Sequence, residues 1–189
     1  MTGVQTCALP ISVISAYKAH YGNSKRKIFC ARSPEESLAL MMKAAVDTNS
    51  AIALSFIWSD AYFIKAYASE DLGRMSEAKA TLQQALKMSP FNAQYLAEMG
   101  QIYAREKKWS KAEQSYREAE DNASLSPSAS KSDDLAKARR GLGYVLVELG
   151  KLDEAEKKYQ QCLAANPNDK KAKAELDYVR EQKAKRKGQ

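Results

Sequence analysis

The sequence predicts an all-α protein, an α-solenoid of antiparallel helix pairs with a capping helix at its C-terminal end. The chain of 189 residues contains only 8 Gly and 5 Pro, and its abundant Ala, Lys, Glu and Leu favour helix. A spacing of small residues also occurs three times: residues 66 and 78, 100 and 112, and 143 and 155 are each Gly or Ala, 12 positions apart. Because small residues let two helices approach closely where they cross, each spacing predicts one helix hairpin.

The stretch from Gly100 to Ala119 shows this pattern most clearly, with a polar turn at Glu106-Lys107-Lys108 between two amphipathic runs. Residues of the same classes recur at matching offsets before and after it. The full set comprises Ala66, Gly73, Ala78, Ala85, Pro90, Gly100, Tyr103, Ala112, Tyr116, Ala119, Gly143, Gly150, Ala155, Tyr159 and Pro167. The pattern resembles the tetratricopeptide repeat, a unit of about 34 residues with small, aromatic and Pro positions in this order. The resemblance implies a superhelix of this type.

The resemblance extends over about residues 59–168, within a helical domain at 33–168. It implies three repeats, at about 59–90, 93–121 and 133–167, preceded by a degenerate half-repeat at 33–58. The helix pairs are expected at 60–72 with 76–88, 93–105 with 110–121, and 133–149 with 153–164. Ala78 and Ala112 are 34 residues apart, but Ala112 and Ala155 are 43 apart, so nine residues are inserted. This Ser-rich insertion, 122–132, is expected to be a mobile loop.

The N-terminal third carries weaker signals. Residues 1–12 look like the translation of a sequencing adapter, which would make them non-native and leave the true N-terminus missing. Residues 13–32 are expected to be an irregular lead-in, with a short helix and a strand or extended run at KIFCA. Ser33 and Pro34 mark a helix start, with Glu36 placed for a capping box. Residues 51–72 are expected to form a buried helix interrupted near Trp58, too short in its apolar part to span a membrane.

The C-terminal segment, 169–189, is expected to be a capping helix and a basic tail. Ala172, Leu176 and Val179 share one face of that helix, and a repeat array needs such a cap because its last apolar face otherwise meets water. A partner-binding tail is the alternative.

No constellation of catalytic residues is found. His20 is the only histidine, and the glycines of Arg140-Gly141-Leu142-Gly143 lack the preceding strand and third glycine of a phosphate loop. No Cys or His cluster has metal-ligand spacing. We therefore expect no enzyme, no catalytic residue, no metal and no cofactor.

The repeat register implies a concave face lined by the first helix of each pair, suited to an extended peptide or a partner helix. Its candidate groove residues are Phe63, Tyr67, Gln101, Arg105, Arg140 and Tyr144. We expect a non-catalytic scaffold or adaptor whose partner is a protein or peptide. Two alternatives stay open: Phe63 and Tyr67 pack against the N-terminal helices, and Arg105 and Arg140 are simply solvated.

Some tetratricopeptide proteins grip the terminal carboxylate of chaperones with Lys and Asn. The corresponding sites here are Phe63, Tyr67, Ala97, Gln101, Arg140 and Tyr144, which argues against such a clamp. The alternative function is a basic accessory protein, since the net charge is +7 and basic residues gather near both ends. It would bind nucleic acid or an anionic surface, but no aromatic residues are interleaved with these cations. The sequence selects no compartment and no oligomeric state.

Overall fold

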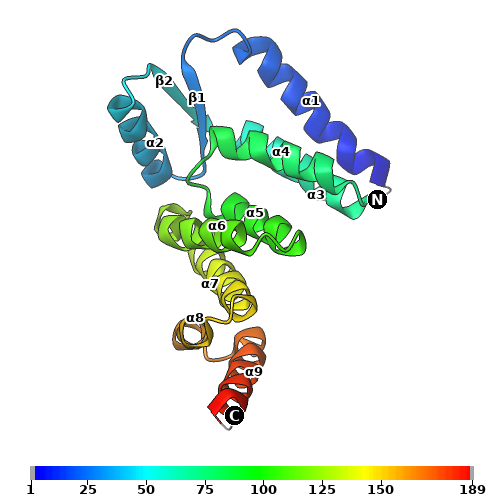
Figure 1. Ribbon diagram of the computed structural model, residues 1–189. Helices are drawn as coiled ribbons and strands as arrows, with labels where there is room; N and C mark the ends of the chain where they lie inside the picture. The colour runs from blue at the N-terminus through cyan, green and yellow to red at the C-terminus, as the bar shows by residue number, and fades with distance from the viewer. Residues whose placement is uncertain (1–2, 188–189) are drawn as a thin grey trace. The chain divides into compact units, whose positions relative to one another are not determined.

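The computed structural model describes residues 3–187, and the side chains of 9–186. The described chain forms two compact units (Figure 1). Unit 1 comprises the described residues up to Tyr95 together with Leu125–Pro127. Unit 2 comprises Leu96–Ser124 and the described residues from Ser128 onward. The ends of the predicted non-native segment and of the basic tail, residues 1–2 and 188–189, lie outside the described residues.

Unit 1 begins with a helix and a β-α-β element. Helix α1 (Gly3–Tyr21) lies along α3 (Ile57–Asp71), where Tyr17 stacks on Trp58 with ring centroids 5.4 Å apart. Strands β1 (Lys27–Ala31) and β2 (Ala51–Ser55) pair in parallel, with Lys27 opposite Ala51. Parallel strands need a crossover, and α2 (Pro34–Val46) supplies it. The short helix and the strand at KIFCA predicted within residues 13–32 are present, as the end of α1 and as β1, and only the expectation that this segment is irregular is wrong.

The helix expected from residue 51 is also wrong over its first five residues, which form β2. A short apolar run such as AIALS reads equally well as a buried strand or a buried helix. Pairing decides in favour of the strand here, since β1 provides a partner. The fully buried side chains Phe29 and Leu40 hold α2 against the sheet, together with Ala44.

The helix start at Ser33 is confirmed. The Ser33 hydroxyl accepts a hydrogen bond from the Glu36 backbone N–H at 2.9 Å, as an N-cap does. The Glu36 carboxylate departs from a capping box, because it accepts the backbone N–H of Arg32, at 2.8 Å, in place of that of Ser33.

The expected helix pairs are present. They are α3 with α4 (Met75–Met88), α5 (Ala93–Arg105) with α6 (Trp109–Asn122), and α7 (Lys131–Glu148) with α8 (Leu152–Ala165). Each first helix ends in the same way, in a residue with positive φ: Gly73, Lys107 and Gly150, at 73°, 54° and 74°. Two backbone hydrogen bonds form at each of these residues. The N–H of the residue with positive φ donates to the carbonyl three positions earlier, and the N–H of the next residue donates to the carbonyl five positions before that next residue. This Schellman motif closes all three hairpins.

Small residues lie where the helices cross. In the first pair, Ala66 and Ala78 are buried. In unit 2 the glycines meet tyrosine rings: a Cβ on Gly100 would lie 2.9 Å from the Tyr116 ring, and one on Gly143 would lie 2.7 Å from the Tyr159 ring. The first helices can therefore approach the second helices only because these positions lack a side chain.

The inserted segment is more ordered than the expected mobile loop. Helix α6 extends to Asn122 and continues into a 3-10 turn, η1 (Ala123–Leu125), before α7 begins at Lys131. Within unit 1, the Ser33 hydroxyl donates to the Leu125 carbonyl at 2.6 Å, and the Arg32 guanidinium donates to Ser126 at 3.2 Å. Hydrogen bonds thus hold the segment Leu125–Pro127 against the start of α2.

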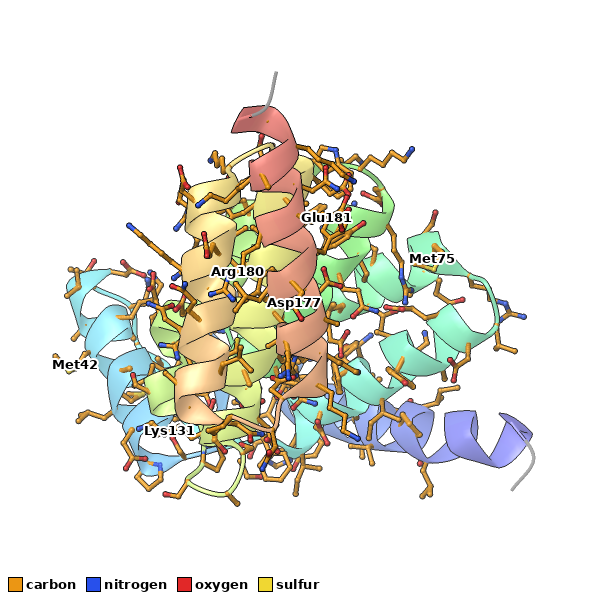
Figure 2. The ribbon with its side chains drawn as sticks, turned by 90° about the horizontal axis from the view of Figure 1, so that it is seen from below. Met42, Met75, Lys131, Asp177, Arg180 and Glu181 are labelled. Atoms are coloured by element: carbon orange, nitrogen blue, oxygen red, sulfur yellow. The ribbon has the colours of Figure 1, made fainter. Side chains whose placement is uncertain are left out.

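Helix α9 (Lys170–Lys187) caps unit 2, as the sequence predicts. It packs against α8, and its Ala172, Leu176 and Val179 side chains are buried. Figure 2 shows the two helices side by side, with Arg180 labelled on α9. The Arg180 guanidinium donates to Glu156 on α8 at 3.2 Å, and Lys183 also pairs with Glu156, at 2.6 Å. None of the helices within residues 3–187 combines the length and the hydrophobicity that a bilayer crossing requires.

Candidate partner-binding surfaces

The candidate groove residues of unit 1, Phe63 and Tyr67, stand one helical turn apart on α3. Phe63 is half-buried and stacks on Tyr95, with ring centroids 4.9 Å apart and planes inclined by 21°. Tyr67 is 56% exposed. The stacking partner of Phe63 therefore comes from α5 and not from the N-terminal helices that the alternative interpretation named.

A buried polar group lies beneath this aromatic pair. The Tyr95 hydroxyl donates to Asp60 at 3.3 Å and lies 3.4 Å from the Ser59 hydroxyl. Burial raises the pKa of Asp60 above its usual range, although the Tyr95 hydrogen bond opposes the rise. Neither Asp60 nor Tyr95 was among the residues predicted from the sequence. The sequence does offer a signal for Asp60, because this residue stands one turn before Phe63 on the same face of α3.

In unit 2, the candidate residue Tyr144 lies on α7. It is 44% exposed and packs edge-to-face against Trp109, with ring centroids 6.2 Å apart and planes inclined by 69°. Trp109 was missed because it stands in the first turn of α6, outside the first helices that the repeat register assigns to the groove.

Two of the candidate residues, Arg105 and Tyr144, influence the pKa of the buried Tyr116. Burial raises the pKa of Tyr116. Glu98 and Tyr144 raise this pKa further, whereas the charge of Arg105 lowers it. Gln101 lies one turn before Arg105 on α5 and is partly exposed.

Arg140 is held differently. Its guanidinium Nη1 donates to the Asp169 carboxylate at 2.5 Å, so it is not simply solvated. Asp169 in turn caps α9 by accepting the Ala172 backbone N–H at 3.1 Å. Burial raises the pKa of Asp169, but this backbone hydrogen bond and Arg140 outweigh burial, and the net shift is downward. The Asp169 partner was missed, because a pair spanning 29 residues has no signature in the sequence.

Several basic residues near the two chain ends contact an acidic, carbonyl or aromatic partner. Lys183 pairs with Asp153 and Glu156, Lys185 pairs with Glu181, and Arg186 donates to the Gly150 carbonyl. Near the other end, Lys18 lies over the Tyr62 ring and Lys27 over the Phe29 ring.

Successive hairpins of two short helices, closed by identical turns and ended by a capping helix, define a helical repeat protein. A tetratricopeptide repeat profile matches residues 59–92, and a second one matches residues 91–168. Because the two matches together span residues 59–168, more than half of the chain, the protein belongs to the tetratricopeptide repeat family. No curated protein matches the sequence.

Solved structures share the fold. The first TPR domain of Spaghetti (RPAP3), bound to the HSP90 peptide SRMEEVD, is 25% identical, with a TM-score of 0.58 over 67% of this chain and 93% of that one. The Arabidopsis OM64 TPR domain is 21% identical, with a TM-score of 0.57 over 66% of this chain and 95% of that one. Pseudomonas aeruginosa pilF is 17% identical, with a TM-score of 0.60 over 97% of this chain and 71% of that one.

Proposed function

We propose that the protein is a non-catalytic interaction module, a scaffold or adaptor that binds a peptide or a partner helix on the surface of its first helices. The observation that carries the proposal is the exposed Tyr144, packed edge-to-face against Trp109. Tyr, Trp and Arg are the residue types that dominate the energetics of protein interfaces. We call Gln101, Arg105, Trp109 and Tyr144 the Tyr144 surface.

Family membership supports the kind of ligand. The RPAP3 domain was solved with a peptide bound, and its match to this chain covers 93% of that domain. A repeat array offers an extended surface on which such a segment can lie. In unit 1, the exposed Tyr67 beside the half-buried Phe63 offers a second contact area of the same chemistry.

The residues at the clamp positions argue for a ligand other than a chaperone C-terminus. Phe63 and Tyr67 stand where Lys and Asn hold the terminal carboxylate in chaperone-binding members, and Ala97 and Gln101 follow on α5. Aromatic side chains contribute apolar area in place of charge. We infer that aromatic packing supplies most of the affinity.

A single substitution tests the proposal. The whole chain is used to capture a partner, and the purified partner is then titrated against Tyr144→Ala and against Tyr178→Ala. Tyr178 is a matched control, since it is 47% exposed on α9, outside the Tyr144 surface. Loss of a hot-spot aromatic costs about 2 kcal/mol or more, so Tyr144→Ala should weaken binding by more than about ten-fold. Equal affinities for the two variants would contradict the proposal.

The same titration addresses the alternative of a basic accessory protein. Binding to nucleic acid falls steeply with added salt, because phosphate contacts release counterions. Affinity that collapses with salt and does not depend on Tyr144 would favour the alternative. The proposal predicts the opposite on both counts.

A further inference from the structure

The two-stranded sheet of unit 1 has one covered edge and one open edge. At the covered edge, α4 packs against β1, and the Ser89 hydroxyl donates to the Cys30 carbonyl at 2.7 Å. The other edge belongs to β2, which packs mainly against β1 and α2. A two-stranded sheet is marginally stable by itself, and an uncovered edge is a template for pairing with another strand. We call the outer edge of β2 the open edge.

The register of the sheet shows which backbone groups the open edge presents. The Lys27 N–H donates to the Ser50 carbonyl at 2.8 Å, and Lys27 lies opposite Ala51. Peptide groups alternate between the two sides of a strand, so the N–H and C=O groups of Ala51, Ala53 and Ser55 point away from β1. Within residues 9–186, these groups make no hydrogen bond.

We propose that the open edge pairs with the open edge of a second copy of the chain, forming a two-fold dimer through a continuous four-stranded sheet. The two β2 strands run antiparallel, with Ala53 opposite its own counterpart and Ala51 opposite Ser55. The inference goes beyond the proposed function and does not rest on it, because it concerns β2 and not the Tyr144 surface.

The unpaired groups of the open edge are placed symmetrically about Ala53. Antiparallel strands exchange two hydrogen bonds at every second residue pair. A two-fold axis at Ala53 therefore pairs the N–H and C=O groups of all three edge residues with those of the second copy. A pairing shifted by two residues leaves the groups of Ala51 or of Ser55 without a partner. The open edge is thus complementary to itself in one register.

The charge and the order of the open edge favour a second copy as its occupant. No charged residue occurs from Thr48 to Ser59, although the net charge of the chain is +7, so two copies meet here without opposing like charges. Edge strands that avoid pairing carry Lys, Pro or a bulge, and β2 has none of these. A second β2 is also already extended, whereas a flexible peptide loses conformational entropy when it joins a sheet.

The side chains of β2 suit the same arrangement. Ala51 packs against the apolar cluster beneath α2, so the alternation of side chains puts Ile52 and Leu54 on the opposite face of the sheet. Both are partly exposed in the single chain. In the dimer, Ile52 of each copy lies directly opposite Leu54 of the other, and such apolar cross-strand pairs stabilise antiparallel sheets.

Helix α2 brings further apolar surface to the dimer. Its side chains Leu38, Met41 and Met42 are 63%, 38% and 62% exposed, and Figure 2 shows Met42 at the outside of the molecule. The two-fold axis is perpendicular to the sheet, so both α2 helices lie on the same face. Because α2 packs on both β1 and β2 and strands lie about 5 Å apart, the two helix axes are about 10 Å apart. This is the distance at which helices pack.

Sedimentation velocity of the whole chain tests the dimer. We expect wild type to change from monomer to dimer as its concentration rises from about 1 to 100 µM. Ala53→Lys and Ala53→Glu each place two like charges directly opposite one another at the axis, so each variant alone should remain monomeric over this range. An equimolar mixture of the two should form a heterodimer, because Lys then lies opposite Glu.

Ala53→Cys tests the register with a small side chain. Opposite residues of a hydrogen-bonded antiparallel pair have Cα atoms about 5.5 Å apart, which suits a disulfide. In a Cys7→Ser background, mild oxidation should link Ala53→Cys into a covalent dimer, since Cys30 and Cys162 are buried. Leu72→Cys is the matched control and should remain unlinked, because Leu72 is 59% exposed at the end of α3 that lies far from β2.

Four results would overturn the inference. They are a monomeric wild type at every concentration, a dimer that persists in both charged variants, a mixture of the folded charged variants that stays monomeric, and equal crosslinking of Ala53→Cys and Leu72→Cys. A monomeric wild type would assign the open edge to an extended segment of another protein instead. Circular dichroism reports whether the charged variants are folded, and if they are not, the cysteine variants decide.

Discussion

At the scale of single residues, the packing of unit 2 depends on Tyr116, which is held between two glycines. A Cβ on Gly100 of α5 would approach its ring to 2.9 Å, and one on Gly141 of α7 would approach it to 2.1 Å. Gly143, two positions later, faces Tyr159 of α8. The two glycines of the Gly-x-Gly run thus contact different hairpins. Gly141 leaves room for Tyr116 of the α5–α6 hairpin, and Gly143 leaves room for Tyr159 within the α7–α8 hairpin.

Gly141→Ala should lower the free energy of unfolding by about 1 to 3 kcal/mol, the usual cost of overpacking. The sign is informative, because Gly→Ala inside a helix otherwise stabilises by about 1 kcal/mol. The measurement is denaturant unfolding of both chains. In the Tyr116→Leu background the clash is relieved, so the same substitution should cost much less there. An equal cost in both backgrounds would show that the ring is not responsible.

Lys107 carries backbone strain that its counterparts avoid. It has φ of 54° at the turn position where the other two hairpins use Gly73 and Gly150. An L-residue in this region costs about 1 kcal/mol relative to Gly. We expect Lys107→Gly to raise the free energy of unfolding by about that amount, measured by denaturant titration.

Gly73→Ala is the matched reverse change, since no atom lies within 4 Å of the added Cβ and only the backbone conformation is affected. It should lower the free energy of unfolding by a similar amount. If Lys107→Gly destabilised the protein, the turn would be stabilised by the lysine side chain, contrary to this account.

At the scale of elements, ion pairs join consecutive second helices of unit 2. Glu113 of α6 accepts from Lys151 at 2.9 Å, at the start of α8. Glu120 accepts from Lys158 of α8 at 2.6 Å and from Arg139 of α7 at 3.0 Å. Only 15% of the Glu120 side chain is exposed, so screening by solvent is limited. These ion pairs supplement the apolar packing between the α5–α6 and α7–α8 hairpins.

The pH dependence of stability should report the Glu120 attachment. Burial raises the pKa of Glu120, but Lys158 and Arg139 outweigh it and hold that pKa below its usual value. A carboxyl with a lowered folded-state pKa stabilises the protein above its unfolded pKa, about 4.3, and this contribution is lost as pH falls through the folded value. Wild type should therefore lose about 0.5 to 1 kcal/mol more than Glu120→Gln between about pH 5 and pH 3.

The control for this measurement is Glu118→Gln. Glu118 stands on the same helix but accepts from the Gln114 amide, at 2.8 Å, in place of a cation. The difference between Glu120→Gln and Glu118→Gln then separates loss of the two ion pairs from removal of one carboxylate as such. If the free energy of unfolding fell equally for wild type and Glu120→Gln on acidification, the ion pairs of Glu120 with Lys158 and Arg139 would contribute nothing measurable.

At the scale of the whole molecule, the two units differ in how well the sequence predicts them. The hairpins of unit 2 were predictable because their crossings need small residues, and Gly100, Ala112, Gly143 and Ala155 mark those crossings in the sequence. The β-α-β element of unit 1 was not, because the five residues of β2 become a strand only through pairing with β1, 24 positions earlier. Long-range pairing leaves no periodic signal in so short a segment.

The candidate binding residues show the same division. The repeat register placed Gln101, Arg105, Arg140 and Tyr144 on first helices, where the structure has them. It did not associate Trp109 with Tyr144 or Asp169 with Arg140, because these contacts join residues 35 and 29 positions apart. Register assigns a residue to a helix face, whereas tertiary packing determines its neighbours.

The claim on which the functional account depends is that a partner contacts the Tyr144 surface. Photocrosslinking tests it most directly, with benzoylphenylalanine at position 144 or, as a control, at Gln161, an exposed residue on the second helix α8. The account predicts a crosslinked partner of discrete mass from position 144 and none from position 161. Equal crosslinking from both positions, or crosslinking from 161 alone, would contradict it.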